Sequence, residues 1–168
     1  MKNSGLYSDD NAVWIKKPQT VELGFNVTSI DEQVFRECTD LTSIMILGSV
    51  TNIGEEAFYK CPGLTDVTIP DSVTSIGDRA FAFCEGLTSV TIGNGVTHIG
   101  EWAFEVCTGL TSITIPDSVT SVGKNAFASC NSMTSIVVEG RTTTEARALL
   151  ADAVYNINIV TGSIPDPA

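Results

Sequence analysis

The sequence has little positive charge and no long apolar run. Lys and Arg total 9 against 20 Asp and Glu, so the formal net charge is −11 at pH 7. A chain this acidic is a poor candidate for binding nucleic acid, which requires clustered cations. No apolar run approaches the roughly 20 residues that span a bilayer, so the sequence predicts no membrane insertion. The first residues contain no apolar segment of the kind found in signal peptides.

Patterns of catalysis and metal binding are missing as well. The single histidine, His98, has no catalytic partner in a recognisable motif, and the sequence contains no G-x-S-x-G, H-E-x-x-H or P-loop pattern. The five cysteines form neither C-x-x-C pairs nor Cys/His clusters, and no calcium-loop pattern occurs. The sequence therefore predicts a protein that is not an enzyme and that holds no metal or cofactor.

A period of 23 residues is the main feature that the sequence does have. Hydrophobic residues make up 43% of the chain, enough for a globular core. Apolar residue types recur in phase at this interval, which indicates internal repeats. The columns are Cys38, Cys61, Cys84, Cys107 and Cys130; Phe35, Phe58, Phe81, Phe104 and Phe127; Leu41, Leu64, Leu87, Leu110 and Met133; and Val27, Val50, Val73, Val96 and Val119.

One repeat unit contains two short strand patterns and a compact turn. Residues 110–115 alternate apolar and hydroxyl side chains, as a half-buried strand does, within the L-x-x-L-x-L shape of a leucine-rich repeat. Pro116 ends this strand, because proline donates no backbone hydrogen bond. Residues 119–122 form a second strand-like stretch, and residues 124–130 are predicted to form one helical or 3₁₀ turn.

Stacking of these units is required because no single unit can bury its apolar residues. We therefore predict an α/β leucine-rich repeat solenoid that is rich in β-structure, with parallel strands and short helical turns. The predicted parts are an N-terminal cap over residues 1–17, repeats over 18–140 in about five to six rungs, a C-terminal cap over 141–160 and a tail over 161–168. Within the C-terminal cap, residues 144–153 read as a short amphipathic helix, and Ile159 lies 23 residues after Ile136.

The repeat resembles the BspA-like leucine-rich repeat, also called the Treponema pallidum type. The shared pattern is C-x-x-L-T-S-I-T-I-P-x-S-V-T-S-I-G-x-x-A-F, and the resemblance covers roughly residues 18–140. It implies a non-enzymatic scaffold for protein–protein interaction or for adhesion to cells or host macromolecules. It also implies a surface or secreted location, although no signal peptide is visible and the location stays open.

The cysteines have two interpretations. A disulfide between adjacent rungs is conceivable by distance, but equivalent Cβ vectors run parallel, which suits the required dihedral angle poorly. We expect instead a ladder of buried, free thiols that pack as small apolar residues.

The candidate partner-binding residues are Trp102, His98, Glu101, Arg79 and Tyr59. They lie in or near the unit that departs most from its neighbours, where Gly93-Asn94-Gly95 also replaces Pro-Asp-Ser. Trp102 is interpreted either as an aromatic anchor for a protein or glycan partner or as a ring packed on Arg79 in a cation–π pair. Phe83 lies in a neighbouring column and would widen the patch.

The outward side of the main strands is rich in Ser and Thr, a composition that suits strands and that, when regular, can also order water at ice surfaces. Met45, Asp66 and Val137 interrupt the columns, which argues against ice binding. An alternative to a binding scaffold is a structural role, in which the chain packs in a larger particle or a homo-oligomer.

Overall fold

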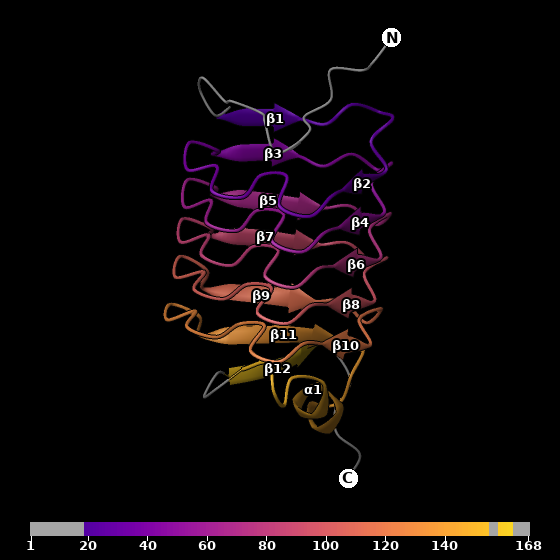
Figure 1. The fold of residues 1–168 in the computed structure, drawn as a ribbon. Helices are drawn as coiled ribbons and strands as arrows, with labels where there is room; N and C mark the ends of the chain where they lie inside the picture. The colour runs from indigo at the N-terminus through magenta and orange to yellow at the C-terminus, as the bar shows by residue number, and fades with distance from the viewer. Residues whose placement is uncertain (1–18, 155–157, 163–168) are drawn as a thin grey trace.

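The computed structural model describes residues 19–154 and 158–162. These residues form a single stack of similar rungs, with β1 at one end and α1 beside β12 at the other (Figure 1). The predicted leucine-rich repeat solenoid with a 23-residue spacing and parallel strands is confirmed. The N-terminal cap predicted over residues 1–17 lies outside the described residues.

Each rung contributes one longer strand and one short strand. The longer strands are β1 (Thr20–Glu22), β3 (Ser43–Met45), β5 (Asp66–Ile69), β7 (Ser89–Ile92), β9 (Ser112–Ile115) and β11 (Ser135–Glu139). The short strands are β2 (Ser29–Ile30), β4 (Asn52–Ile53), β6 (Ser75–Ile76), β8 (His98–Ile99) and β10 (Ser121–Val122). The chain ends with α1 (Thr143–Leu149) and β12 (Asn158–Gly162).

Strand pairing follows the sequence period. In β5 and β7, Val67 pairs with Val90 and Ile69 with Ile92, so equivalent residues of successive units are neighbours. The short strands form a continuous five-stranded sheet in the order β10-β8-β6-β4-β2. Each apolar column of the sequence thereby becomes a continuous ladder along the stack.

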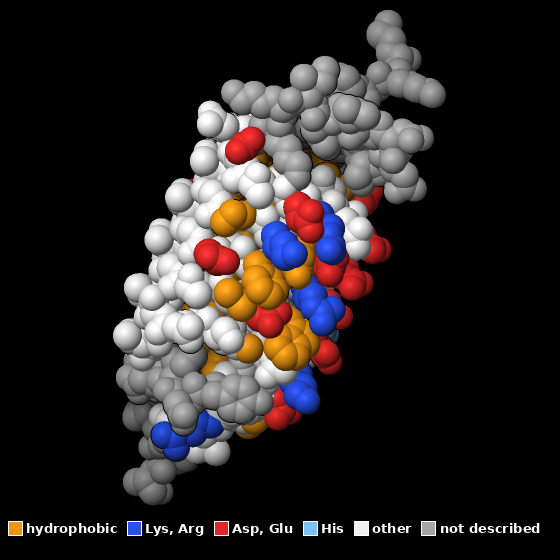
Figure 2. Space-filling model, turned by 60° about the vertical axis from the view of Figure 1, so that its left-hand side comes forward, with side chains coloured by type: hydrophobic (Ala, Val, Ile, Leu, Met, Phe, Trp, Pro, Cys, Tyr) orange, Lys and Arg blue, Asp and Glu red, His pale blue; other side chains and the backbone are white. Residues whose placement is uncertain are grey.

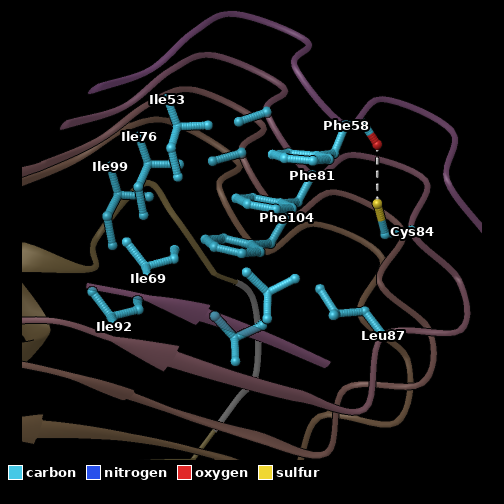
Figure 3. Packing of buried hydrophobic residues seen from close by; sticks show 14 of the residues in the cluster. Ile53, Phe58, Ile69, Ile76, Phe81, Cys84, Leu87, Ile92, Ile99 and Phe104 are labelled. Atoms are coloured by element: carbon cyan, nitrogen blue, oxygen red, sulfur yellow. Dashed lines mark hydrogen bonds between the residues drawn. The ribbon is translucent and has the colours of Figure 1, made fainter. Parts of the chain in front are cut away.

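Stacked phenylalanine rings form the centre of the core (Figure 3). The ring centroids of Phe58 and Phe81 are 5.0 Å apart with an angle of 6° between the ring planes. Phe81 and Phe104 repeat this arrangement at 5.3 Å and 4°. Since each ring is fully buried, a rung without its phenylalanine would leave a void between two others.

The five cysteines form no disulfide and are buried, as the sequence predicted. Each thiol from the second unit onward donates to the carbonyl oxygen of the phenylalanine 26 residues earlier, for example Cys84 to Phe58 at 3.1 Å (Figure 3). Burial raises the pKa of the Cys84 thiol well above its usual range. The Cys84 thiol therefore stays protonated at neutral pH and acts as a core residue with a weak hydrogen-bond donor.

Two columns of threonine hydroxyls tie the rungs together at the surface. The Thr74 hydroxyl donates to the Thr51 carbonyl oxygen and the Thr97 hydroxyl to that of Thr74, both at 3.1 Å. A second column links Thr88 to Thr65 at 3.0 Å. Strand propensity alone does not account for these threonines, because each also forms a specific bond to the preceding rung.

Glycine recurs where the backbones of successive rungs meet. A Cβ atom on Gly77 would lie 2.6 Å from the carbonyl carbon of Gly54, and one on Gly100 would lie 2.6 Å from the amide nitrogen of Asp78. Real Cβ atoms essentially never approach other atoms so closely. This column, which also contains Gly123, is therefore fixed by the close stacking of the turns.

The sheet of longer strands is interrupted between β7 and β9. The order β1-β3-β5-β7 forms one sheet and β12-β11-β9 another, although the five-stranded sheet of short strands passes through the same rungs without a break. Just before the longer strand, the backbone amides of Thr88 and Thr134 each donate to the carbonyl oxygen of the equivalent threonine in the preceding rung, at 2.9 Å. Thr111 makes no such bond among the described residues.

A helix and a final strand close the carboxyl end of the stack (Figure 1). Thr142 caps α1 by accepting from the Glu145 amide, while the Glu145 carboxylate accepts from the Thr142 amide at 2.9 Å. β12 pairs with β11 so that Ile159 lies opposite Ile136, as the 23-residue offset predicted. The strand continues to Gly162, which the sequence analysis had placed in the tail.

Candidate binding surface

The turns between each short strand and the next longer strand build one face of the solenoid. We call this surface the turn face and define it as the exposed and half-buried side chains of residues 32–39, 55–62, 78–85, 101–108 and 124–131. Two residues of each turn adopt a positive φ. They are Gln33 and Glu37, Glu56 and Lys60, Arg79 and Phe83, Trp102 and Val106, and Asn125 and Ser129.

This backbone conformation replaces the helical or 3₁₀ turns that the sequence suggested. A left-handed residue interrupts a right-handed helix, so the backbone amides point along the stack instead of along the turn. Phe58 donates its amide to the Ala80 carbonyl oxygen at 2.7 Å and Lys60 to that of Ala82 at 2.9 Å. Each turn is therefore held by the next one, and its side chains are displayed at a fixed spacing.

A charged network occupies the first turns of this face. Arg36 forms an ion pair with Glu56, which also accepts from the Gln33 side-chain amide at 3.0 Å. Glu37 lies 3.9 Å from both the Arg36 and Lys60 side-chain nitrogens. At this distance and exposure the Glu37 pairs contribute little stability, and their main effect is to hold the side chains in place.

Tyr59 lies at the centre of an aromatic and cationic cluster. The Arg36 guanidinium is 4.6 Å from the Tyr59 ring centroid and the Lys60 nitrogen is 5.3 Å from it. The Phe83 ring contacts Tyr59 edge-on, with centroids 5.4 Å apart and an interplanar angle of 64°. The sequence analysis named Tyr59 and Phe83 but missed Arg36 and Lys60, whose only signal was their place in the same columns one rung away.

Trp102, Arg79 and Glu101 lie farther along the same face, linked through the backbone. Arg79 donates its amide to the Glu101 carbonyl oxygen at 2.9 Å. Trp102 is half-buried with a φ of 58°, and its backbone amide donates to the Lys124 carbonyl oxygen at 3.1 Å. Among the described residues the cation–π contacts belong to Tyr59, and none joins Trp102 to Arg79.

His98 lies in β8, before the turn, and is exposed there as the sequence predicted. It stands between Ser75 and Ser121 of the neighbouring strands. Its Nδ1 atom lies 2.7 Å from the Thr97 hydroxyl oxygen. The side chain therefore borders the turn face and contacts the threonine column.

The glycines of Gly93-Asn94-Gly95 have a packing role. A Cβ atom on Gly93 would lie 2.5 Å from the Pro70 carbonyl carbon, and one on Gly95 would clash with the Asp71 carbonyl oxygen. The Asn94 amide donates to the Asp71 carboxylate at 2.7 Å. Close stacking thus explains this departure from the repeat, which the sequence analysis had grouped with the candidate site.

Figure 2 shows hydrophobic side chains gathered between Lys or Arg and Asp or Glu side chains on one face of the molecule. Beside them lies a broad surface without charge or apolar colour, as expected for Ser and Thr. The turn face also contains a depression lined by Glu37, Thr39, Lys60, Pro62, Phe83 and Glu85, which we call the Phe83 depression. Aromatic, cationic and anionic groups therefore meet at one surface, a combination suited to macromolecular recognition.

Other kinds of site find no support in the described part of the chain. Residues 19–154 and 158–162 contain no group of three or more His, Cys, Asp or Glu arranged to hold a metal ion. None of the helices in these residues is long and apolar enough to cross a bilayer.

Comparison with solved structures identifies the same architecture. The leucine-rich repeat protein of Treponema pallidum superposes with a TM-score of 0.75 at 24% identity, over 91% of this chain and 73% of that one. A leucine-rich repeat protein of Bacteroides capillosus is 44% identical over 54% of this chain and 64% of its own, with a TM-score of 0.51. The pneumococcal vaccine antigen PcpA has a TM-score of 0.67 at 23% identity, over 80% of this chain but only 34% of that one. No curated protein matches this chain.

A family comparison covers almost the whole sequence. The BspA type leucine rich repeat region matches residues 10–134 and 51–166, with six copies of the repeat. The first range includes the whole phenylalanine and cysteine columns, and both ranges include Gly54, Gly77, Gly100 and Gly123. The chain belongs to the BspA-type leucine-rich repeat family.

Proposed function

We propose that this protein is a non-enzymatic binding module that recognises a protein or glycan partner through its turn face. The observation that carries the proposal is the type of side chain at the positive-φ positions. Large side chains, including Phe83, Trp102 and Val106, occupy them and are half-buried. Asn or Gly adopts this backbone at lower cost, so stability alone would favour those residues there.

The residues of the proposed surface suit a contact with a macromolecule. Trp102 supplies apolar area at low entropic cost, and tryptophan and arginine are common in the energetic centres of protein interfaces. Arg79 and Glu101 add charge of both signs beside it, and His98 borders the surface. Tyr59 and Phe83 extend the aromatic area toward the first rungs. Adhesion to cells or host macromolecules is the form of binding that the family resemblance supports.

Replacement of Trp102 tests the proposal. The Trp102→Asn variant should fold normally, because Asn125 has the same place in the next turn and a φ of 57°. Wild type and variant are screened on arrays of extracellular proteins and glycans, with Met45→Thr on the surface of the longer strands as the control. We expect a partner whose affinity falls at least about tenfold in Trp102→Asn, a loss of about 1.4 kcal/mol, and is unchanged in the control.

A different pattern of effects would reject the turn face. If Met45→Thr or a Thr91→Asp change on β7 abolishes binding while Trp102→Asn does not, the strand surface is the binding site.

Assembly into a larger particle or homo-oligomer is the alternative function. It is supported by the position of β1 and β12 as terminal strands of their sheets, where strand pairing can continue into another molecule. Sedimentation equilibrium separates the two functions. A stable oligomer that persists in the Trp102→Asn variant supports assembly through the ends of the stack, and a monomer supports the binding module.

A further inference from the structure

The Phe83 depression has the features of a receptor for one positively charged side chain. This inference rests on the proposed function and concerns the chemistry of the partner. Two apolar residues, Pro62 and Phe83, line the depression together with the acidic residues Glu37 and Glu85. It lies on a face that the solenoid displays rigidly, since the turns are hydrogen-bonded to one another from rung to rung.

The Phe83 ring is a half-buried aromatic surface that forms no cation–π contact within residues 19–154 and 158–162. Both cation–π contacts among the described residues use the Tyr59 ring, with Arg36 at 4.6 Å and Lys60 at 5.3 Å. Phe83 meets Tyr59 edge-on, which leaves a face of its ring free of that contact. The same local chemistry that holds Arg36 on Tyr59 is therefore available at Phe83 for a cation from outside.

Glu85, which lines the depression beside Phe83, forms no ion pair within residues 19–154 and 158–162. Glu37 and Glu56 lie close to Arg36 or Lys60, whereas Glu85 and Glu105 form no ion pair among the described residues. Glu85 lines the depression and is exposed. Phe83 donates its amide to the Glu105 carbonyl oxygen at 2.7 Å, so Glu105 lies in the adjoining turn. A cation in the depression would gain the Glu85 carboxylate as a partner without displacing an existing ion pair.

Lys60 is the one basic residue that lines the depression. Its nitrogen is 3.9 Å from the Glu37 carboxylate and 5.3 Å from the Tyr59 ring centroid. Its charge is therefore already placed near Glu37 and the Tyr59 ring.

We propose that the Phe83 depression binds an arginine side chain of a protein partner. The guanidinium stacks on the Phe83 ring and donates to the Glu85 carboxylate, while Pro62 covers the aliphatic part of the side chain. Arginine suits this environment because its planar cation both stacks on aromatic rings and pairs with carboxylates. The formal net charge of −11 further favours the approach of a basic segment.

Peptide titration followed by NMR tests this assignment directly. The probe is acetyl-Gly-Arg-Gly-amide, and the control is the same peptide with citrulline, which keeps the shape of arginine but has no charge. The arginine peptide should shift the amide signals of Phe83, Glu85 and Glu105 in a saturable manner. The citrulline peptide should bind at least about fivefold more weakly.

Variants of the protein separate a formed site from general attraction to an acidic surface. Phe83→Val introduces the residue that Val106 supplies at the same place in the next turn, and Glu85→Gln removes the charge. Each variant should lower the affinity for the arginine peptide by about fivefold. The control variant Glu22→Gln removes an exposed carboxylate from β1 and should have no effect.

The result that overturns the proposal is binding without a preferred place. Shifts spread over many acidic residues, or equal losses in Glu85→Gln and Glu22→Gln, would mean counter-ion attraction only. A lysine peptide that binds as tightly as the arginine peptide would also refute the stacking of a guanidinium. A further outcome is that the arginine peptide gives no specific binding while Trp102→Asn still lowers the affinity for a partner found on the arrays. That result would reject the arginine site alone and would leave the turn face as a binding surface.

Discussion

Individual side chains show most clearly how the 23-residue period becomes structure. Phe81 lies between Phe58 and Phe104, and each neighbour presents a parallel ring about one rung away. Because the rungs are close to identical, each ring meets the same environment on both sides. A cavity at Phe81 therefore removes packing contacts from both Phe58 and Phe104, and neither ring can move to fill it without leaving its other neighbour.

Phe81→Ala should lower the free energy of unfolding by about 3–5 kcal/mol, because it leaves a cavity in a closed ladder. Denaturant unfolding followed by circular dichroism measures the change. Met45→Thr is the control, since Met45 is 55% exposed and Thr occupies the same place in three later rungs. A loss for Phe81→Ala below about 1 kcal/mol would contradict the tight packing of the ladder.

Residues of the core were predictable and those of the binding surface were only partly so. The spacing of Phe81 and Cys84 at once identified them as buried, because repetition of apolar residues has no other physical cause at this length. Arginine and tryptophan rarely adopt a positive φ, so the residue types at Arg79 and Trp102 did not indicate the turn conformation. The contact of Arg36 with Tyr59 depends on side-chain rotamers, which a single sequence does not reveal.

At the scale of the structural elements, the glycine column decides how closely the turns approach. Gly77 faces the backbone of Gly54, and no movement of a flexible side chain can make room for a methyl group. Gly48 lies in a different turn with nothing within 4 Å of a Cβ atom. Close packing thus requires glycine at position 77 but not at position 48, so Gly48 serves as the control for Gly77.

Gly77→Ala should destabilise the protein by about 1–3 kcal/mol or more, since the rungs must separate locally. Gly48→Ala should be neutral or stabilising by about 0.4–1 kcal/mol, because alanine lowers the entropy of the unfolded chain. Thermal unfolding of the two variants compares them. Equal effects would mean that the turns are not in close contact at Gly77.

The interruption between β7 and β9 should be visible in backbone amide exchange. The Thr111 amide lacks the bond to the preceding rung that Thr88 and Thr134 make at 2.9 Å. We expect the Thr111 amide to exchange at least about tenfold faster than either of them under native conditions. NMR-detected hydrogen exchange measures all three amides in one experiment. Similar protection at the three positions would show that β7 and β9 pair in solution.

The molecule as a whole is a linear array, in which every rung contacts only its neighbours. Its ends should therefore open more often than its middle. The cysteines report on this opening, because there is one in each of five rungs and all are buried. Burial raises the pKa of the Cys84 thiol, which further suppresses its reaction with thiol reagents in the folded state.

Cys84 should react last with a thiol reagent at pH 8, and Cys130 and Cys38 should react first. Mass spectrometry of peptides after timed labelling gives the five rates, and labelling in denaturant gives the control in which all five react quickly. A further consequence concerns pH. Since burial raises the pKa of the Cys84 thiol in the folded state and the unfolded thiol ionises near its ordinary pKa of about 8.5, the contribution of Cys84 to the free energy of unfolding should fall as the pH rises above that value. Fast labelling of Cys84 in the native protein would contradict the closed core.

Most of the hydrogen bonds between rungs join residues about 22 to 26 positions apart, and the same bonds recur in most rungs of the stack. At the level of the gene, duplication or loss of a whole number of 23-codon units restores every such bond, whereas any other insertion within the array shifts the phenylalanine, cysteine and glycine columns out of phase. The scaffold thus permits change in length by recombination between its own repeats. Each duplicated unit also carries its turn residues to a new position, so the same event that lengthens the array copies a piece of the turn face beside the original.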